Sequence, residues 1–132
     1  METAPAPEFR PFFEHLKAGR LAFPYCEDCG RYHWYPMPRC PHCRGVEIAW
    51  RAVEGPAEVY TWTVVRHAFD PALADELPYV VALVVFAEAP GVRLLTNLVE
   101  VEPADIAIAM AVAPIFPEPS EPSPRVTFRP LA

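Results

Sequence analysis

Apolar and polar residues alternate along residues 57–66, AEVYTWTVVR, as expected of a strand with one buried face. Residues 79–87, YVVALVVFA, are almost wholly apolar, so we expect a central strand covered on both faces. The sequence EAPG at 88–91 indicates a turn after it. Further strands are expected at 92–99, 111–116 and 125–128. Roughly five short strands of this kind predict a small β-barrel.

The N-terminal part of the chain shows a different periodicity. Apolar residues at Phe12, Phe13 and Leu16 lie on one side of a helix over 11–19, with Gly19 at its C-cap. The loop at 68–78 should contain one helical turn near 72–76. Between helix and barrel we expect strands at 21–25 and 32–35, the second returning from the first, and an extended segment at 48–53.

Proline content restricts the fold class. The 18 prolines of this 132-residue chain break long helices, while 52% hydrophobic residues are enough to form a core, so the fold should be mainly β. The N-terminus METAPAPEF lacks the apolar region of a signal peptide, and no apolar run is long enough to span a membrane. We therefore expect a cytoplasmic protein with reduced cysteines.

The four cysteines form two C-x-x-C pairs, Cys26 with Cys29 and Cys40 with Cys43. Two facing knuckles of this kind present four thiolates to one tetrahedral metal ion, which predicts a structural Zn²⁺ site with no open coordination position. Gly30 and the glycine at 45 should supply the positive φ angles that the knuckles need. Rubredoxin-like iron and redox-active thiols are the alternatives.

Other chemistry-bearing residues do not form a recognisable catalytic set. His33 and His42 lie near the cysteine pairs and are interpreted as surface residues or as neighbours of the metal ligands, and His15 and His67 have no evident partner. No nucleophile elbow or phosphate-binding loop is present in the sequence. We therefore predict no catalytic residues; residues that would bind an organic cofactor are not indicated.

Charge is distributed unevenly. Residues 10–51 hold seven basic and four acidic side chains, whereas residues 52–132 hold four basic and eleven acidic ones, a net of −7. An acidic barrel argues against nucleic-acid binding, which a zinc ribbon with a small barrel would otherwise suggest. The aromatic residues around the cysteine pairs either pack between the two parts of the chain or face a partner.

The sequence resembles a family of zinc-ribbon and OB-fold proteins. This family is known as domain of unknown function 35 (DUF35), and its members are also called acyl-CoA-associated OB-fold proteins. The likeness covers nearly the whole chain. It lies in the helix with Phe12, Leu16, Gly19 and Leu21, the two cysteine pairs, the strand VYTWTVV at 59–65, PYV at 78–80, GVRL at 91–94 and TNLV at 96–99. One departure is Ala109, where the family usually has glycine. Alanine fits there if its φ is negative, in which case the local turn differs.

The resemblance implies a fold and a function. It implies an N-terminal helical segment at 1–22, a rubredoxin-like zinc ribbon at 23–48 and a C-terminal five-stranded OB-fold barrel at 49–132. It further implies a non-catalytic accessory subunit of a hetero-oligomer. The partner would be a thiolase-fold protein, either a thiolase or a lipid-transfer-protein-like aldolase, or a MaoC-type hydratase, and the two chains would share a CoA thioester.

The resemblance also implies a pathway. In actinobacteria such accessory modules act in steroid (cholesterol) side-chain degradation, and the Ala-, Pro- and Arg-rich composition with a single lysine fits a high-GC source of that kind.

Two functions other than that of an accessory subunit remain open from the sequence. A nucleic-acid-binding module is the alternative function, which the acidic barrel disfavours. A stand-alone CoA-dependent enzyme is the third, and it would need catalytic groups that the sequence does not show.

Overall fold

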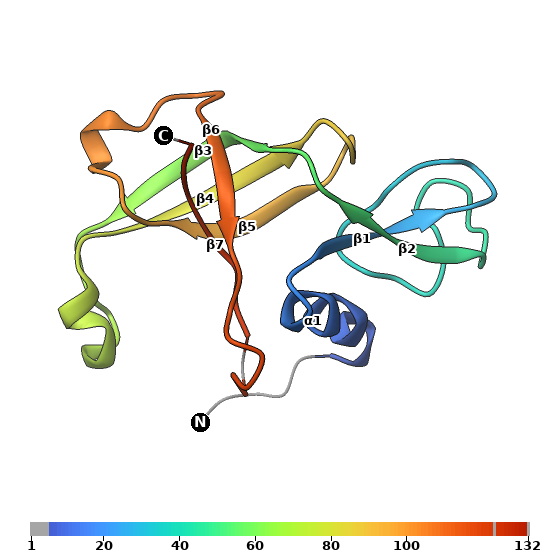
Figure 1. The fold of residues 1–132 in the computed structure, drawn as a ribbon, viewed down its shortest axis with the longest axis horizontal. Coiled ribbons are helices and arrows are strands. Elements are labelled where there is room, and N and C mark those ends of the chain that lie inside the picture. The colour runs from blue at the N-terminus through green and yellow to red at the C-terminus, as the bar shows by residue number, and fades with distance from the viewer. Residues whose placement is uncertain (1–5, 123, 132) are drawn as a thin grey trace.

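In a computed structural model of the chain, which describes residues 6–122 and 124–131, a small ribbon and a short helix lie beside a closed five-stranded barrel (Figure 1). The 3-10 turn η1 (Pro7–Phe9) leads into α1 (Arg10–Lys17), whose buried residues are Phe12 and Leu16. The fold is thus mainly β with one short N-terminal helix, as the proline content and strand patterns predicted.

Helix α1 ends where glycine permits a left-handed backbone. Gly19 has a φ of 77°, its N–H donates to the carbonyl of Leu16 at 3.0 Å, and the N–H of Arg20 donates to the carbonyl of His15 at 2.9 Å. These two bonds form a Schellman C-cap, which satisfies carbonyls that the helix end would leave unpaired. The predicted role of Gly19 is confirmed.

Strand β1 (Leu21–Cys26) pairs in antiparallel register with β2 (Ile48–Val53), from Leu21 opposite Val53 to Cys26 opposite Ile48. The return strand predicted at 32–35 is wrong, because only Tyr32 bridges back to Tyr25. The chain between β1 and β2 is instead used in two turns around the cysteines, and its prolines cannot donate to a strand ladder.

The barrel consists of five strands in the order β3-β4-β5-β7-β6, with β6 closing onto β3. The strands are β3 (Ala57–Val65), β4 (Tyr79–Phe86), β5 (Arg93–Leu98), β6 (Ala111–Ile115) and β7 (Thr127–Pro130). The 3-10 turns η2 (Pro71–Glu76) and η3 (Pro103–Asp105) lie in the β3–β4 and β5–β6 connections, so the helical turn expected near 72–76 is confirmed.

Strand β4 is central but not covered on both faces as predicted. Val80, Ala82, Val84 and Phe86 are buried, while the alternate residues are only half-buried. The outward face of this barrel strand lacks a second covering layer, so the apolar sequence overstates its burial.

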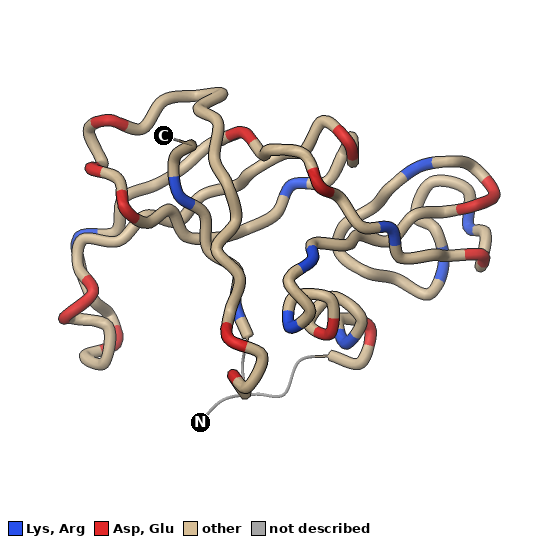
Figure 2. Tube along the Cα trace, viewed as in Figure 1, with Lys and Arg blue, Asp and Glu red and all other residues tan. Residues whose placement is uncertain are grey.

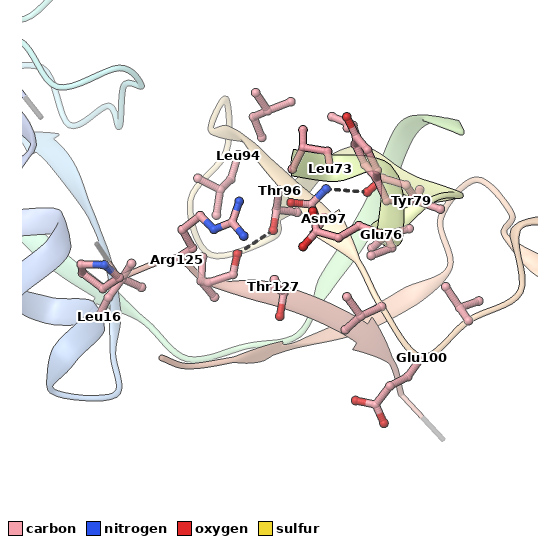
Figure 3. A pocket seen from close by; sticks show the side chains of 18 of the residues that line it. Leu16, Leu73, Glu76, Tyr79, Leu94, Thr96, Asn97, Glu100, Arg125 and Thr127 are labelled. Atoms are coloured by element: carbon pink, nitrogen blue, oxygen red, sulfur yellow. Dashed lines mark hydrogen bonds between the residues drawn. The ribbon is translucent and has the colours of Figure 1, made fainter. Parts of the chain in front are cut away.

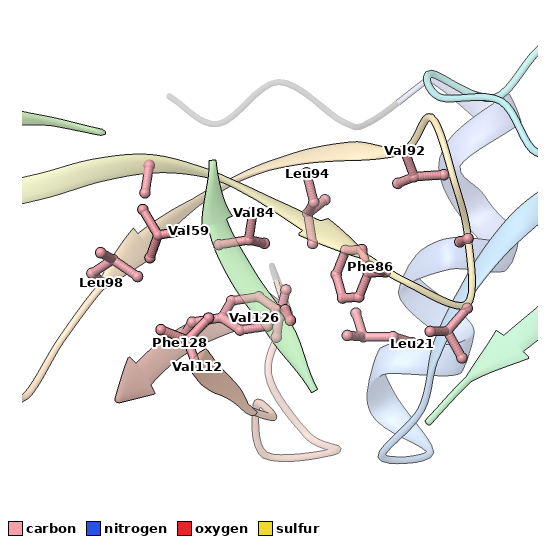
Figure 4. Close-up of a cluster of buried hydrophobic side chains, with 14 of the residues drawn as sticks. Leu21, Val59, Val84, Phe86, Val92, Leu94, Leu98, Val112, Val126 and Phe128 are labelled. Carbon is pink, nitrogen blue, oxygen red and sulfur yellow. The ribbon is translucent and has the colours of Figure 1, made fainter. Parts of the chain in front are cut away.

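The hydrophobic core runs from the barrel into the ribbon (Figure 4). Phe128, Val59 and Val84 lie inside the barrel, and Phe86 and Leu21 extend the cluster toward the ribbon. The Phe23 ring of β1 lies 5.1 Å from the Phe86 ring of β4, and 6.2 Å from the Phe12 ring of α1. Ribbon, helix and barrel therefore share one core.

The link between β2 and β3 is tied to the β4–β5 turn by one carboxylate. The backbone N–H groups of Glu54 and Gly55 donate to Oε2 of Glu88 at 2.8 and 2.7 Å. The N–H groups of Gly55 and Glu54 hold the pKa of this carboxyl below its ordinary value. Glu88 thus holds the ribbon–barrel link in place as a charged hydrogen-bond acceptor.

The turn before β6 corrects an expectation. Ala109 has a φ of 67°, so it occupies the left-handed conformation without glycine, and its N–H donates to the carbonyl of Val59 at 2.9 Å. The negative φ considered for this alanine is therefore not adopted. The turn tolerates alanine because β3 fixes its backbone, at the steric cost of the left-handed conformation.

Charged side chains follow the division of the fold (Figure 2). Lysine and arginine are frequent along α1 and the ribbon, whereas aspartate and glutamate predominate on the barrel and its loops. Within the described part of the chain, no helix is both long and apolar enough to cross a membrane.

Candidate metal centre

The two cysteine pairs form two turns with the same hydrogen-bond pattern. In the first, the N–H of Gly30 donates to the carbonyl of Cys26 at 2.9 Å, and the N–H of Cys26 donates to the carbonyl of Arg31 at 2.9 Å. In the second, the N–H of Arg44 donates to the carbonyl of Cys40, and the N–H of Cys40 donates to the carbonyl of Gly45, both at 2.8 Å. This repeated geometry directs both cysteines of each pair to one side.

The positive φ angles of these turns are at Gly30, with 72°, and at Arg44, with 66°. The expectation for Gly30 is confirmed, but the one for Gly45 is wrong by one position. Gly45 is constrained differently, because a Cβ atom there would collide with the carboxylate of Asp28 and lie 3.2 Å from the sulfur of Cys43. Glycine at this position leaves room for the sulfur cluster.

The four sulfur atoms are placed as a tetrahedral metal site requires. All lie within 4.8 Å of one another; the sulfurs of Cys26 and Cys43 are 3.5 Å apart and those of Cys29 and Cys40 are 3.6 Å apart. Tetrahedral zinc with Zn–S bonds of about 2.3 Å needs S···S separations of about 3.8 Å. All four cysteines are free thiols. The donor set therefore fits one zinc ion.

Backbone N–H groups point at the sulfurs of the second pair. The N–H of His42 lies 3.3 Å from the sulfur of Cys40, and the N–H of Gly45 lies 3.4 Å from that of Cys43. Burial raises the pKa of Cys40, but the N–H groups of Cys43 and His42 outweigh it and lower that pKa to about 6. Burial and the thiol of Cys40 raise the pKa of Cys29 to about 12. Binding of a cation would thus displace protons from the cluster.

The histidines lie outside the sulfur cluster. His42 is exposed, with Nε2 at 3.4 Å from the carbonyl of Tyr32. His33 is only 4% exposed, which removes the surface alternative and leaves that of a neighbour of the metal ligands, and neither ring nitrogen has a hydrogen-bond partner among the described residues. Burial, and then the nearby His42, lower the pKa of His33, which favours the neutral ring.

The remaining two histidines have partners that sequence reasoning missed. Nε of Arg20 donates to Nδ1 of His15 at 3.2 Å across the end of α1, and burial and Arg20 lower the pKa of His15. The His67 ring packs edge-on against Phe69 at 4.8 Å. These contacts explain both rings structurally and assign neither to a reacting centre.

The aromatic residues around the ribbon divide into packed and exposed ones. Phe12, Phe23 and Trp34 pack together, with the Phe12 and Trp34 rings 4.9 Å apart, and join the ribbon to α1. Tyr35 is 59% exposed beside Phe9, and Met37 is exposed two residues later. The ribbon therefore combines an aromatic core with an apolar outer surface.

Sequence reasoning also missed a groove on the barrel, formed by β4, β5, α1 and the loops around η2 and before β7 (Figure 3). Its residues come from segments far apart in the chain, so no single motif marks it. The signal that could have found it is the barrel fold, because loops and strands in these positions form the usual binding face of OB folds.

Comparison with family models agrees with this geometry. Residues 13–48 match the model described as "ChsH2, rubredoxin-like zinc ribbon domain", and residues 50–116 match "ChsH2, C-terminal OB-fold domain". The ribbon is thus a zinc-ribbon domain whose four cysteines are clustered for metal binding, and the barrel is an OB fold.

Two curated relatives are similar over part of their length. A "Probable enoyl-CoA hydratase alpha subunit" of Thermomonospora curvata is 43% identical over 103 residues, covering 76% of this chain and 30% of that protein. A "DUF35 domain-containing scaffold protein" of Methanocaldococcus jannaschii is 32% identical over 92 residues, covering 69% of this chain and 63% of that protein. The chain therefore spans less than two thirds of either relative.

Solved structures extend the likeness to nearly the whole chain. A chain of the "Ltp2-ChsH2(DUF35) aldolase" has a TM-score of 0.84 and 36% identity, covering 98% of both chains. A DUF35 protein of Sulfolobus solfataricus has a TM-score of 0.67 at 20% identity, covering 95% of this chain and 86% of that one, and shows the fold alone. This chain belongs to the DUF35 family of ChsH2-type zinc-ribbon and OB-fold proteins.

Proposed function

We propose that this chain is a non-catalytic accessory subunit that binds a thiolase-fold partner, either a thiolase or an aldolase, and helps form the partner's acyl-CoA site. The observation that carries the proposal is the full-length likeness, at 36% identity, to a chain of the Ltp2-ChsH2(DUF35) aldolase. The scaffold name of the Methanocaldococcus relative agrees with it. One zinc ion held by Cys26, Cys29, Cys40 and Cys43 would fix the ribbon in this role without acting on substrate.

The ribbon carries side chains suited to a protein interface. Tyr35 and Met37, which we call the ribbon patch, are exposed, and Met37 lies near the half-buried Trp50. Exposed arginines also belong to the ribbon: Arg31, Arg39, Arg44 and Arg51. Aromatic, methionine and arginine side chains are enriched in interface cores, and an excess of arginine favours an acidic partner surface or the phosphates of CoA.

The finer parts of the proposal rest on the family resemblance. The acyl thioester would be one of steroid side-chain degradation, the assembly a cytoplasmic hetero-oligomer, and a MaoC-type hydratase a further partner. The hydratase name of the Thermomonospora relative supports the last point only weakly, since this chain matches 30% of that protein.

A capture experiment with paired variants tests the docking role. Tyr35→Asp combined with Met37→Asp should remove most of the thiolase-fold protein that co-purifies with the tagged chain, because both charges would be desolvated in the interface. Ile108→Asp is the control, since Ile108 is also an apolar residue exposed to solvent but belongs to the barrel end near η3. Equal recovery of partner by all three proteins would reject the ribbon as the docking surface.

A further inference from the structure

The loop between β3 and β4 protrudes from the barrel. None of the residues of its 3-10 turn η2 is buried, and Phe69, which lies just before this turn, is 92% exposed. We call residues 67–77 the barrel arm. Because the Phe69 ring removes almost no apolar surface from water, it contributes little to the stability of the core.

The barrel arm nevertheless has a defined backbone. The carboxylate of Asp70 accepts a hydrogen bond from the N–H of Ala72 at 3.0 Å, and the carbonyl of Asp70 accepts one from the N–H of Leu73 at 2.9 Å. The Phe69 ring packs edge-on against the ring of His67 at 4.8 Å. These contacts order the loop in advance, so less conformational entropy is lost when another protein covers Phe69.

The barrel arm is also acidic. It contains Asp70, Asp75 and Glu76, and no lysine or arginine occurs among residues 67–77. Figure 2 shows this acidic loop at the end of the molecule away from the basic ribbon. An exposed aromatic ring among carboxylates is complementary to an apolar pocket whose edge carries lysine or arginine side chains.

The barrel arm and the ribbon patch are connected by a continuous surface. Met37 of the ribbon patch lines a small hollow together with Pro11 at the start of α1. Phe13 of the same helix and Leu73 of the barrel arm line one groove, and Figure 1 shows α1 and the loop before β4 on the same side of the barrel. A protein that covers the ribbon patch and α1 can therefore reach the barrel arm.

We propose that the barrel arm is a second docking surface for the thiolase-fold partner, with Phe69 inserted into an apolar pocket edged by lysine or arginine side chains. The inference rests on the proposed function, because this partner is the protein that docks on the ribbon patch. Since the ribbon is basic and the barrel arm is acidic, the partner's surface has the opposite order of charges. The two contacts together select one orientation of docking.

Photo-crosslinking within the purified complex tests this contact. The tagged, zinc-loaded full-length chain carries p-benzoylphenylalanine in place of Phe69 or, as the control, in place of Ile108, which is 73% exposed near η3. We expect position 69 to crosslink to the thiolase-fold partner, at a peptide that combines apolar residues with lysine or arginine. Position 108 should give no such product. Crosslinks from position 69 only to a second copy of this chain, or none at all, would overturn the proposal.

Affinity measurements with the partner recovered from the complex test the aromatic anchor and the charges separately. Phe69→Asp should weaken binding at least tenfold, and Phe69→Leu should weaken it less because it keeps an apolar side chain. Asp75→Asn with Glu76→Gln should weaken binding and reduce its dependence on salt. The matched pair Glu102→Gln with Asp105→Asn, at exposed residues of the η3 region, should change neither. Circular dichroism checks that all variants fold.

The outcomes separate this inference from the proposed function. If the ribbon-patch variant loses the partner while Phe69→Asp binds it as tightly as the unmodified chain, the proposed function stands and the barrel arm is rejected as a docking surface. Equal effects of the acidic pair and its control would reject the basic edge of the pocket. If no thiolase-fold protein is recovered with the unmodified chain, the proposed function fails, and the inference about the barrel arm fails with it.

Discussion

Two non-glycine residues of this chain adopt strained backbone conformations that the sequence alone does not show. Ala109 adopts a φ of 67° in a turn that β3 holds, and Arg44 adopts 66° in the second cysteine turn. Left-handed backbone costs a non-glycine residue roughly 1–2 kcal/mol. At these two positions the surrounding hydrogen bonds outweigh the local preference.

Ala109→Gly should therefore stabilise the protein. Glycine relieves the left-handed strain but gains entropy in the unfolded chain, so we expect a net gain of about 0.5 kcal/mol in the free energy of unfolding. Urea denaturation measures it. Ala107→Gly is the matched control: its φ is not positive, so it should lower stability, and a loss of stability from Ala109→Gly as well would contradict the strained turn.

The zinc site can also be tested with variants of single residues. Cys40→Ser should reduce bound zinc from one ion per chain to well below one and unfold the ribbon, because metal-binding energy in such a site is folding energy. His42→Asn, within the same turn but outside the four-sulfur group, should keep one zinc per chain. Elemental analysis of both proteins measures the metal. Iron in place of zinc, or full zinc content in Cys40→Ser, would count against the assignment.

At the scale of elements, the strands with a clear period were predictable and the ribbon loops were not. Alternation located β3, because the pattern of apolar residues follows burial, and the extended segment expected at 48–53 coincides with β2. The prediction of a return strand at 32–35 was wrong because the turns around the cysteines determine the path of the chain there. Hydrophobic periodicity carries no information on such turns. The last strand starts at Thr127, two residues later than expected, after a proline-rich loop.

The metal site could be predicted from the sequence, whereas the groove on the barrel could not. The clustering of all four cysteines could be predicted from their spacing, because two cysteines with two residues between them report local geometry. The groove joins residues of α1, β4, β5 and two loops, so its lining depends on the closed barrel and could not be read from any one segment.

The junction of β1 with the barrel gives a test of the shared core. Phe23→Ala should lower the free energy of unfolding by about 3–5 kcal/mol, since this buried ring packs on Phe86 and Trp34 and leaves a cavity when removed. Phe69→Ala removes an equal side chain that is 92% exposed, and should change stability by no more than about 0.5 kcal/mol. Similar losses for the two variants in urea denaturation would mean that ribbon and barrel do not share a core.

The molecule as a whole combines a basic ribbon and helix with an acidic barrel, joined by one core (Figure 2). This distribution disfavours a continuous cationic groove of the kind that single-stranded nucleic acids need. It is suited to the proposed assembly, in which the ribbon contacts a partner protein.

Capture of the tagged, zinc-loaded chain from its native lysate, with mass spectrometry and stoichiometry of the co-purifying proteins, tests the accessory-subunit claim most directly. We predict a thiolase-fold protein in stoichiometric amount, whose recovery depends on the ribbon patch. Recovery of the chain alone, or with nucleic acid in place of such a partner, would contradict the account.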